Sequence, residues 1–144
     1  MERYSLTHLA DRFLLHGLHT LVVHDRATTA DMLAHIAEID HRRLYAPAGY
    51  PSMRAYCIGE LHLSEDSAAK RIQAARKARE FPVIFDALAD GRLHLSGVTL
   101  LAPHLTAATV DELAAAATHQ TKSEIELLLA ERFPRNDAAT HCAH

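Results

Sequence analysis

The side chains of this chain that are best suited to bind an anionic partner form a cationic cluster between positions 54 and 79. Arg54 stands first, and Lys70-Arg71 and Arg76-Lys77 follow at helical spacing. With Arg79 they outnumber the acids of residues 51–79 by six to three, although the whole chain carries a formal net charge of −3. Guanidinium and ammonium groups neutralise phosphate and reach base edges in DNA grooves. The cluster predicts contact with duplex DNA, and a solvated basic helix face is the alternative.

Serines inside this cluster add hydroxyl groups that can hydrogen-bond phosphate. We expect Lys70 and Arg71 nearest the bases and the other cations on phosphate. Glu65 and Asp66 argue against a sequence reader, because carboxylates at the start of this helix repel phosphate. A plain helical hairpin inside a bundle is the alternative to a DNA-reading unit. The predicted DNA contacts are Arg54, Ser64, Ser67, Lys70, Arg71, Arg76 and Lys77.

The histidines, twelve in number, raise the question of a metal site. His16 and His19 share a helix face, but a zinc site needs at least one more protein ligand. The tail His141-Cys142-Ala143-His144 offers three ligands without a preformed site. We therefore expect solvated histidines, no metal and no cofactor. Cys57 lies on the apolar side of a short helix, which predicts an inert core thiol.

Catalytic motifs are missing from the sequence. It has no GxSxG, no P-loop and no GxGxxG. His119, Asn136 and His144 have a spacing that roughly suits a single-metal nuclease, but a well-capped helix is expected over 121–132, where such a site needs a hairpin. We expect no catalytic residue, so this chain alone should be inactive.

Helices must position these residues, because Ala and Leu dominate and β-branched runs are few. The fold class predicted is all-α: a long N-terminal helix, then a compact helical bundle with a helix-turn-helix-like unit. Apolar residues at three- and four-residue steps predict one helix over 11–44, about 51 Å long. Thr28-Thr29 with Asp31 could instead cap a second helix that folds back; we favour the continuous helix. The further helices are expected at 53–60, 65–80, 83–90, 97–102, 107–118 and 122–132.

Caps and breakers divide the chain. Two prolines and a glycine in residues 46–51 end the first helix. Ser64, Ser96 and Thr106 are expected to cap later helices, and Thr121 with Glu124 forms a capping box. We expect a helical arm at 1–46, a helix-turn-helix-like domain at 47–134 and a frayed tail at 135–144.

Two resemblances follow from these elements. Ser64, Pro82, the Gly91-Arg92-Leu93 step and Ser96 stand in an order that resembles the helix-turn-helix region of ParB-type partition proteins. A longer string resembles the N-terminal region of bacterial HNH endonuclease-type proteins. It includes AGYPSMRAYC, LHLSEDSAAKRIQAARKAREFP, FDALADGRLHLSGVTLLAPHLT and TKSEIELLLAERFP. This resemblance implies a DNA-associated role in bacterial cytoplasm. The HNH motif itself is missing, so the chain looks truncated before its catalytic half or like an isolated domain.

The functional expectation is a DNA-associating helical module that is not catalytic by itself. Double-stranded DNA is the expected partner, bound weakly by this chain alone. The alternative is a protein–protein interaction module that dimerises through residues 11–44. No apolar run reaches 18 residues, the N-terminus shows no signal-peptide pattern, and two cysteines make no disulfide framework. We therefore expect no membrane contact and a cytoplasmic location.

Overall fold

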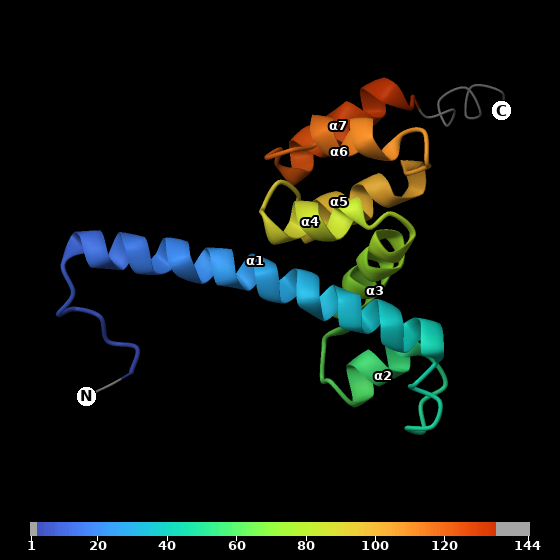
Figure 1. The fold of residues 1–144 in the computed structure, drawn as a ribbon, viewed down its shortest axis with the longest axis horizontal. Coiled ribbons are helices and arrows are strands. Elements are labelled where there is room, and N and C mark those ends of the chain that lie inside the picture. The colour runs from blue at the N-terminus through green and yellow to red at the C-terminus, as the bar shows by residue number, and fades with distance from the viewer. Residues whose placement is uncertain (1–2, 135–144) are drawn as a thin grey trace, which may run out of the picture.

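The computed structural model describes residues 3–134, and this part of the chain is helical with no β-strand. The all-α prediction is confirmed: one long helix is followed by a bundle of shorter ones (Figure 1). No helix among residues 3–134 combines the length and apolar character needed to cross a bilayer. The elements are α1 (Asp11–Arg42), α2 (Met53–Gly59), α3 (Glu65–Glu80), α4 (Val83–Ala89), α5 (Leu95–Leu101), the 3₁₀ turn η1 (Ala102–His104), α6 (Val110–Ala116) and α7 (Lys122–Arg132).

Helix α1 is continuous, as favoured from the sequence, and Thr28-Thr29 lies within it rather than at a second start. It ends two residues before the expected boundary because Arg43 adopts a left-handed conformation, with φ 55°. The Arg43 amide donates to the Asp40 carbonyl, and the Leu44 amide donates to the Ile39 carbonyl. Such bonds satisfy the last helical carbonyls and turn the chain.

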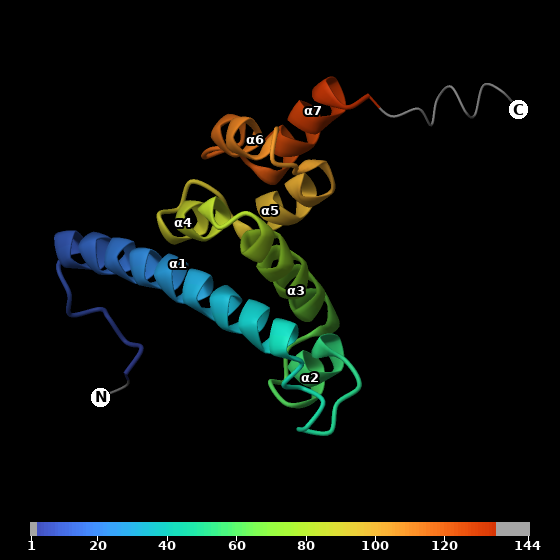
Figure 2. The ribbon, with the colours of Figure 1, turned by 45° about the vertical axis from the view of Figure 1, so that its right-hand side comes forward.

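Helix α3 lies at the centre of the fold and packs against α1, α2 and α5. Four of its alanines, Ala68, Ala74, Ala75 and Ala78, are fully buried. Their small side chains let neighbouring helices approach closely, and α1 runs beside α3 (Figure 2). The second half of α1 shares this core, because Leu33, Ile36 and Ala37 are buried in it. Only the first half of α1 extends away from the bundle (Figure 1).

Two helix starts differ from the sequence prediction. Ser96 does not cap α5; the Nδ1 atom of His94 accepts a hydrogen bond from the Gly97 amide, so α5 begins at Leu95. Thr106 does not cap α6 directly, because its Oγ1 accepts from the Thr109 amide and forms a turn before the helix. Helix α6 therefore covers only Val110–Ala116 instead of 107–118. The Thr121–Glu124 capping box of α7 is confirmed.

Candidate nucleic-acid interface

Helices α2 and α3 form the hairpin that carries most of the predicted contacts. The hydroxyl of Ser52 caps α2 by accepting from the Ala55 amide, and Ser64 caps α3 by accepting from the Ser67 amide. Between the helices His62 takes a left-handed conformation with φ 59°, a geometry that more often selects glycine. The connection therefore turns sharply and fixes the direction of α3 relative to α2.

The core of this hairpin is formed mainly by residues of α3. Ile72 and Ala75 are buried, and Leu63 packs at the edge of the core. Leu61 is 46% exposed, because it lies in the turn between the two helices. Ala68 is fully buried on α3 and Ala55 is half-buried on α2, which agrees with small residues at the crossing of the two helices.

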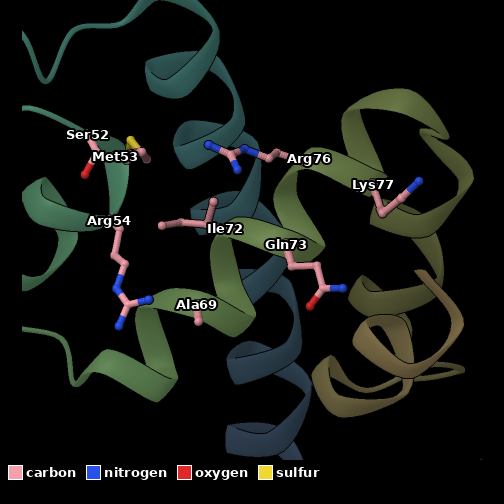
Figure 3. A pocket seen from close by; sticks show the side chains of 8 residues that line it. All are labelled: Ser52, Met53, Arg54, Ala69, Ile72, Gln73, Arg76 and Lys77. Atoms are coloured by element: carbon pink, nitrogen blue, oxygen red, sulfur yellow. The ribbon is translucent and has the colours of Figure 1, made fainter. Parts of the chain in front are cut away.

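A shallow groove of about 550 Å³ runs between the start of α2 and the outer face of α3 (Figure 3). Met53, Ala69 and Ile72 contribute apolar lining, while Arg54, Arg76 and Lys77 contribute positive charge. No acidic side chain lines it. The full lining is Ser52, Met53, Arg54, Ala69, Ile72, Gln73, Arg76 and Lys77. The groove is therefore a shallow concavity with a positively charged lining, and a large anionic partner could reach it from solvent.

The cations around this groove have acidic neighbours. Arg76 binds Asp40 of α1 through two hydrogen bonds of 2.8 and 3.1 Å. This pairing raises the pKa of Arg76. Asp40 is only 17% exposed, so this bidentate pair braces α3 against α1. Arg76 therefore helps to hold α3 against α1 and is only partly available to bind phosphate.

The remaining cations of this face make looser pairs. Lys77 Nζ lies 3.1 Å from Glu80, and Lys70 Nζ lies 3.3 Å from Asp66. The closest approach of Arg54 to Glu65 is 3.9 Å. Exposed pairs of this kind contribute only about 0–1 kcal/mol, so phosphate can compete for these cations.

Arg71 lies elsewhere on α3. It follows Lys70 by one residue, which is about 100° around the helix. Its guanidinium donates to the Ser67 hydroxyl at 2.6 Å, and it lines a second groove with Val22, Asp25 and Arg26 of α1. The structure therefore separates Lys70 from Arg71, which the sequence had placed together nearest the bases. The hydroxyls of Ser64 and Ser67 are likewise engaged in bonds within α3.

Gln73 was missed by sequence reasoning. It is exposed on α3 and lines the charged groove. Its spacing from Lys70 and Lys77, three and four residues away, was the available signal, since residues so spaced share a helix face. A glutamine there can pair with an adenine edge in the major groove.

Histidine and cysteine groups give no metal site among residues 3–134, where no three His, Cys, Asp or Glu side chains gather closely enough to hold an ion. The tail histidines and Cys142, with Asn136, lie outside the described residues. Cys57 is fully buried, and burial raises the pKa of its thiol, which keeps it protonated and unreactive.

Comparison with known proteins adds no relative: no protein-family model, no curated protein and no solved structure matches this chain. What the chain can bind is therefore inferred from the α2–α3 hairpin itself. A helix with an exposed row of long polar side chains, held by a second helix across a short turn, can lie along a duplex groove.

Proposed function

We propose that this chain associates with double-stranded DNA through α3, with α2 bracing it. The observation that carries the proposal is the groove beside α3, where three cations and no acid line a surface open to solvent. The resemblance of the sequence to the N-terminal region of HNH endonuclease-type proteins supports the same role. Binding by the isolated chain should be weak, because phosphate must compete with the carboxylates that already pair with these cations in the protein.

The structure narrows the residues that should be tested first. Arg54, Lys70 and Lys77 make ion pairs with neighbouring surface carboxylates, and Lys77 Nζ also lies 6.0 Å from the centre of the Phe81 ring. Replacing these three residues should leave the fold intact. Arg71 and Arg76 each make closer contacts inside the protein, and their loss would mix binding with stability. The informative variant is the triple replacement of Arg54, Lys70 and Lys77 by Ala.

The experiment is fluorescence anisotropy of a labelled duplex at several salt concentrations. If three phosphate contacts are lost, the slope of log affinity against log salt should fall by about 2.7 units. The matched control replaces Arg92, Lys122 and Arg132 by Ala, which removes the same charge from the α4–α5 connection and α7. Equal losses in both variants would show nonspecific charge attraction and contradict the proposed face.

We also propose, as a second function, that the N-terminal half of α1 is an association surface for protein. The observation behind it is the row of exposed leucines on that half, with Leu15, Leu18 and Leu21 each more than 60% exposed. Contiguous apolar surface of this kind marks interaction sites in soluble proteins. Residues beyond about position 29 are excluded from this role, since α3 and α4 already cover that part of α1.

A further inference from the structure

The second groove, of about 400 Å³, lies on the side of α3 away from the charged groove. Arg71 lines it and stands two residues from both Ala69 and Gln73, which line the charged groove. Two residues turn an α-helix by about 200°, so Arg71 lies on nearly the opposite side of α3. The other walls of the second groove come from α1, the end of α4 and the loop that leads into α5. A duplex bound over the charged groove would therefore leave the second groove open to another ligand.

Arg26 of α1 lies in the second groove with its guanidinium against Gly91. A Cβ built on Gly91, whose φ is +83°, would lie 2.6 Å from Cζ, 2.6 Å from Nη1 and 2.7 Å from Nε of Arg26. Because these three distances are almost equal, Gly91 lies over the flat face of the guanidinium and not at its edge. The N–H groups of a guanidinium point outward in its plane, so this stacking leaves them available to an acceptor.

Neither Arg26 nor Arg71 has a carboxylate partner within residues 3–134. No Asp or Glu stands three or four residues from either of them along the chain. No carboxylate oxygen of the described residues lies within 4.0 Å of either guanidinium, and this includes Asp25, which lines the same groove. Over the same range the guanidinium of Arg71 donates only to Ser67, through Nη1. Most of the N–H groups of both arginines are therefore available to a ligand.

We propose that Arg26 and Arg71 bind the phosphate group of a small phosphorylated ligand in the second groove. The two guanidiniums reach the groove from different helices. A phosphate presents terminal oxygens on several sides and can accept from both, whereas one guanidinium already matches the two oxygens of a carboxylate. The two positive charges also exceed the single negative charge of Asp25, so the groove attracts a dianion.

The rest of the groove suits the body of such a ligand. Its volume falls in the range of small-molecule sites, roughly 300–1,000 Å³. Leu88 and Leu93 line it and are each 4% exposed, so they form an apolar floor that is fixed by the core. The inference is independent of DNA binding, because the groove lies on the opposite side of α3.

Titration of the full chain with inorganic phosphate tests the site, with chloride added to keep the ionic strength constant. Heteronuclear NMR of the nitrogen-labelled protein reports on each group. We expect saturable shifts of the Gly91 amide and of the Nε–H signals of Arg26 and Arg71, with a Kd on the order of 1 mM, because this probe lacks an apolar body. No saturable shift at about ten times that concentration, or equal shifts at all arginines, would overturn the proposal.

Single substitutions separate this site from general charge attraction. Arg26→Gln and Arg71→Gln should each raise the phosphate Kd about tenfold, because each removes a charged donor. Asp25→Asn should lower the Kd, because it removes the acid from the groove lining. Arg12→Gln is the matched control, since Arg12 is about 21 Å from Arg26 along α1 and beyond the screening length of about 10 Å. Equal weakening by Arg12→Gln and Arg26→Gln would contradict a defined site.

Two further variants keep both arginines. Gly91→Ala should raise the phosphate Kd at least about threefold, because it displaces the Arg26 guanidinium from its position in the groove. Ser67→Ala removes the bond that Arg71 makes within α3 and should leave phosphate binding intact. A loss in Ser67→Ala as large as that in Arg71→Gln would show that Arg71 acts through the structure of α3 and not on the ligand.

Duplex binding distinguishes the source of the phosphate. Arg26→Gln should leave the affinity for a labelled duplex unchanged within about twofold, because that cation lies outside the charged groove. A parallel loss of phosphate and duplex affinity would assign the second groove to the DNA backbone and overturn the small ligand. A wild type that binds phosphate but no duplex would contradict the proposed DNA role and leave this site in place.

Discussion

The two halves of α1 both carry apolar residues at three- and four-residue steps, but their environments are opposite. In the second half, Leu33 is fully buried and Ile36 nearly so, beneath α3 and α4. In the first half, Leu18 and Leu21 face solvent on the same continuous helix. The comparison shows that apolar spacing is compatible with a helix in both halves, while a neighbouring element determines which half becomes core. An apolar row with no neighbour in its own chain is therefore informative about partners.

Replacing a leucine in each half should give the largest contrast. Leu33→Ala should lower the free energy of unfolding by about 2–5 kcal/mol, since it leaves a cavity in a packed core. Leu18→Ala, measured at protein concentrations where the chain is monomeric, should change it by less than about 0.5 kcal/mol. Urea unfolding followed by circular dichroism measures both. Similar costs for the two would mean that the first half of α1 is also covered in the monomer.

Gly91, in the loop after α4, lies against Arg26 near the middle of α1. Substitution at this position should have the next largest effect on stability. Its φ is +83°, and an added Cβ would lie 2.6 Å from the Arg26 guanidinium. Gly91→Ala should therefore cost about 1–2 kcal/mol from the left-handed backbone, with the Arg26 side chain displaced. Thermal unfolding compared with the wild type checks this, and an unchanged midpoint would contradict the tight turn at this boundary.

Acidic pH should affect the covered half through Glu38. Its carboxylate binds Arg79 of α3 at 2.8 Å and Arg42 at 2.7 Å, and these hydrogen bonds lower its pKa from 4.5 to about 2. Because the folded-state pKa lies below the ordinary value, the stabilisation is complete above about pH 4.5 and is lost as pH falls toward 2. The stability difference between wild type and Glu38→Gln should therefore be constant near neutrality and shrink below pH 4.5. A difference independent of pH over this window would argue that the carboxylate is not paired in solution.

Gly17 in the free half should give the smallest global effect. A Cβ added there meets nothing within 4 Å. Gly17→Ala should stabilise the local helix by up to about 1 kcal/mol. Amide hydrogen exchange over residues 13–21 should slow, while the global unfolding midpoint stays in place. A clear rise in that midpoint would show that the arm unfolds together with the bundle.

Much of the fold could be predicted from the sequence because its signals are local. The cap at Ser64 and the capping box at Thr121 each act within one turn of chain, and both predictions are confirmed. The predicted start of α5 was wrong, because the residue that caps this helix is His94 and not Ser96. The second ring nitrogen of His94 hydrogen-bonds the carbonyl of Gln120, which is distant in the sequence. Such a cap depends on tertiary packing, which a local pattern does not contain.

The candidate site was less predictable for the same reason. The sequence identifies a cationic stretch, but the pairing of Arg76 with Asp40 joins residues 36 positions apart. The position of Arg71, beside Arg26 in the second groove, likewise depends on how α1 crosses α3. Which cations face solvent is therefore a tertiary property, and the DNA contacts themselves stay a prediction.

The most direct test of the central proposal is binding of the wild-type chain to a labelled duplex while salt is varied. Weak but saturable binding is expected at about 50 mM salt, with log affinity falling linearly against log salt at a slope of about −2.7 or steeper. That slope would correspond to at least three phosphates neutralised by the α2–α3 face. No binding at about 50 mM salt, or binding insensitive to salt, would contradict DNA association by this chain.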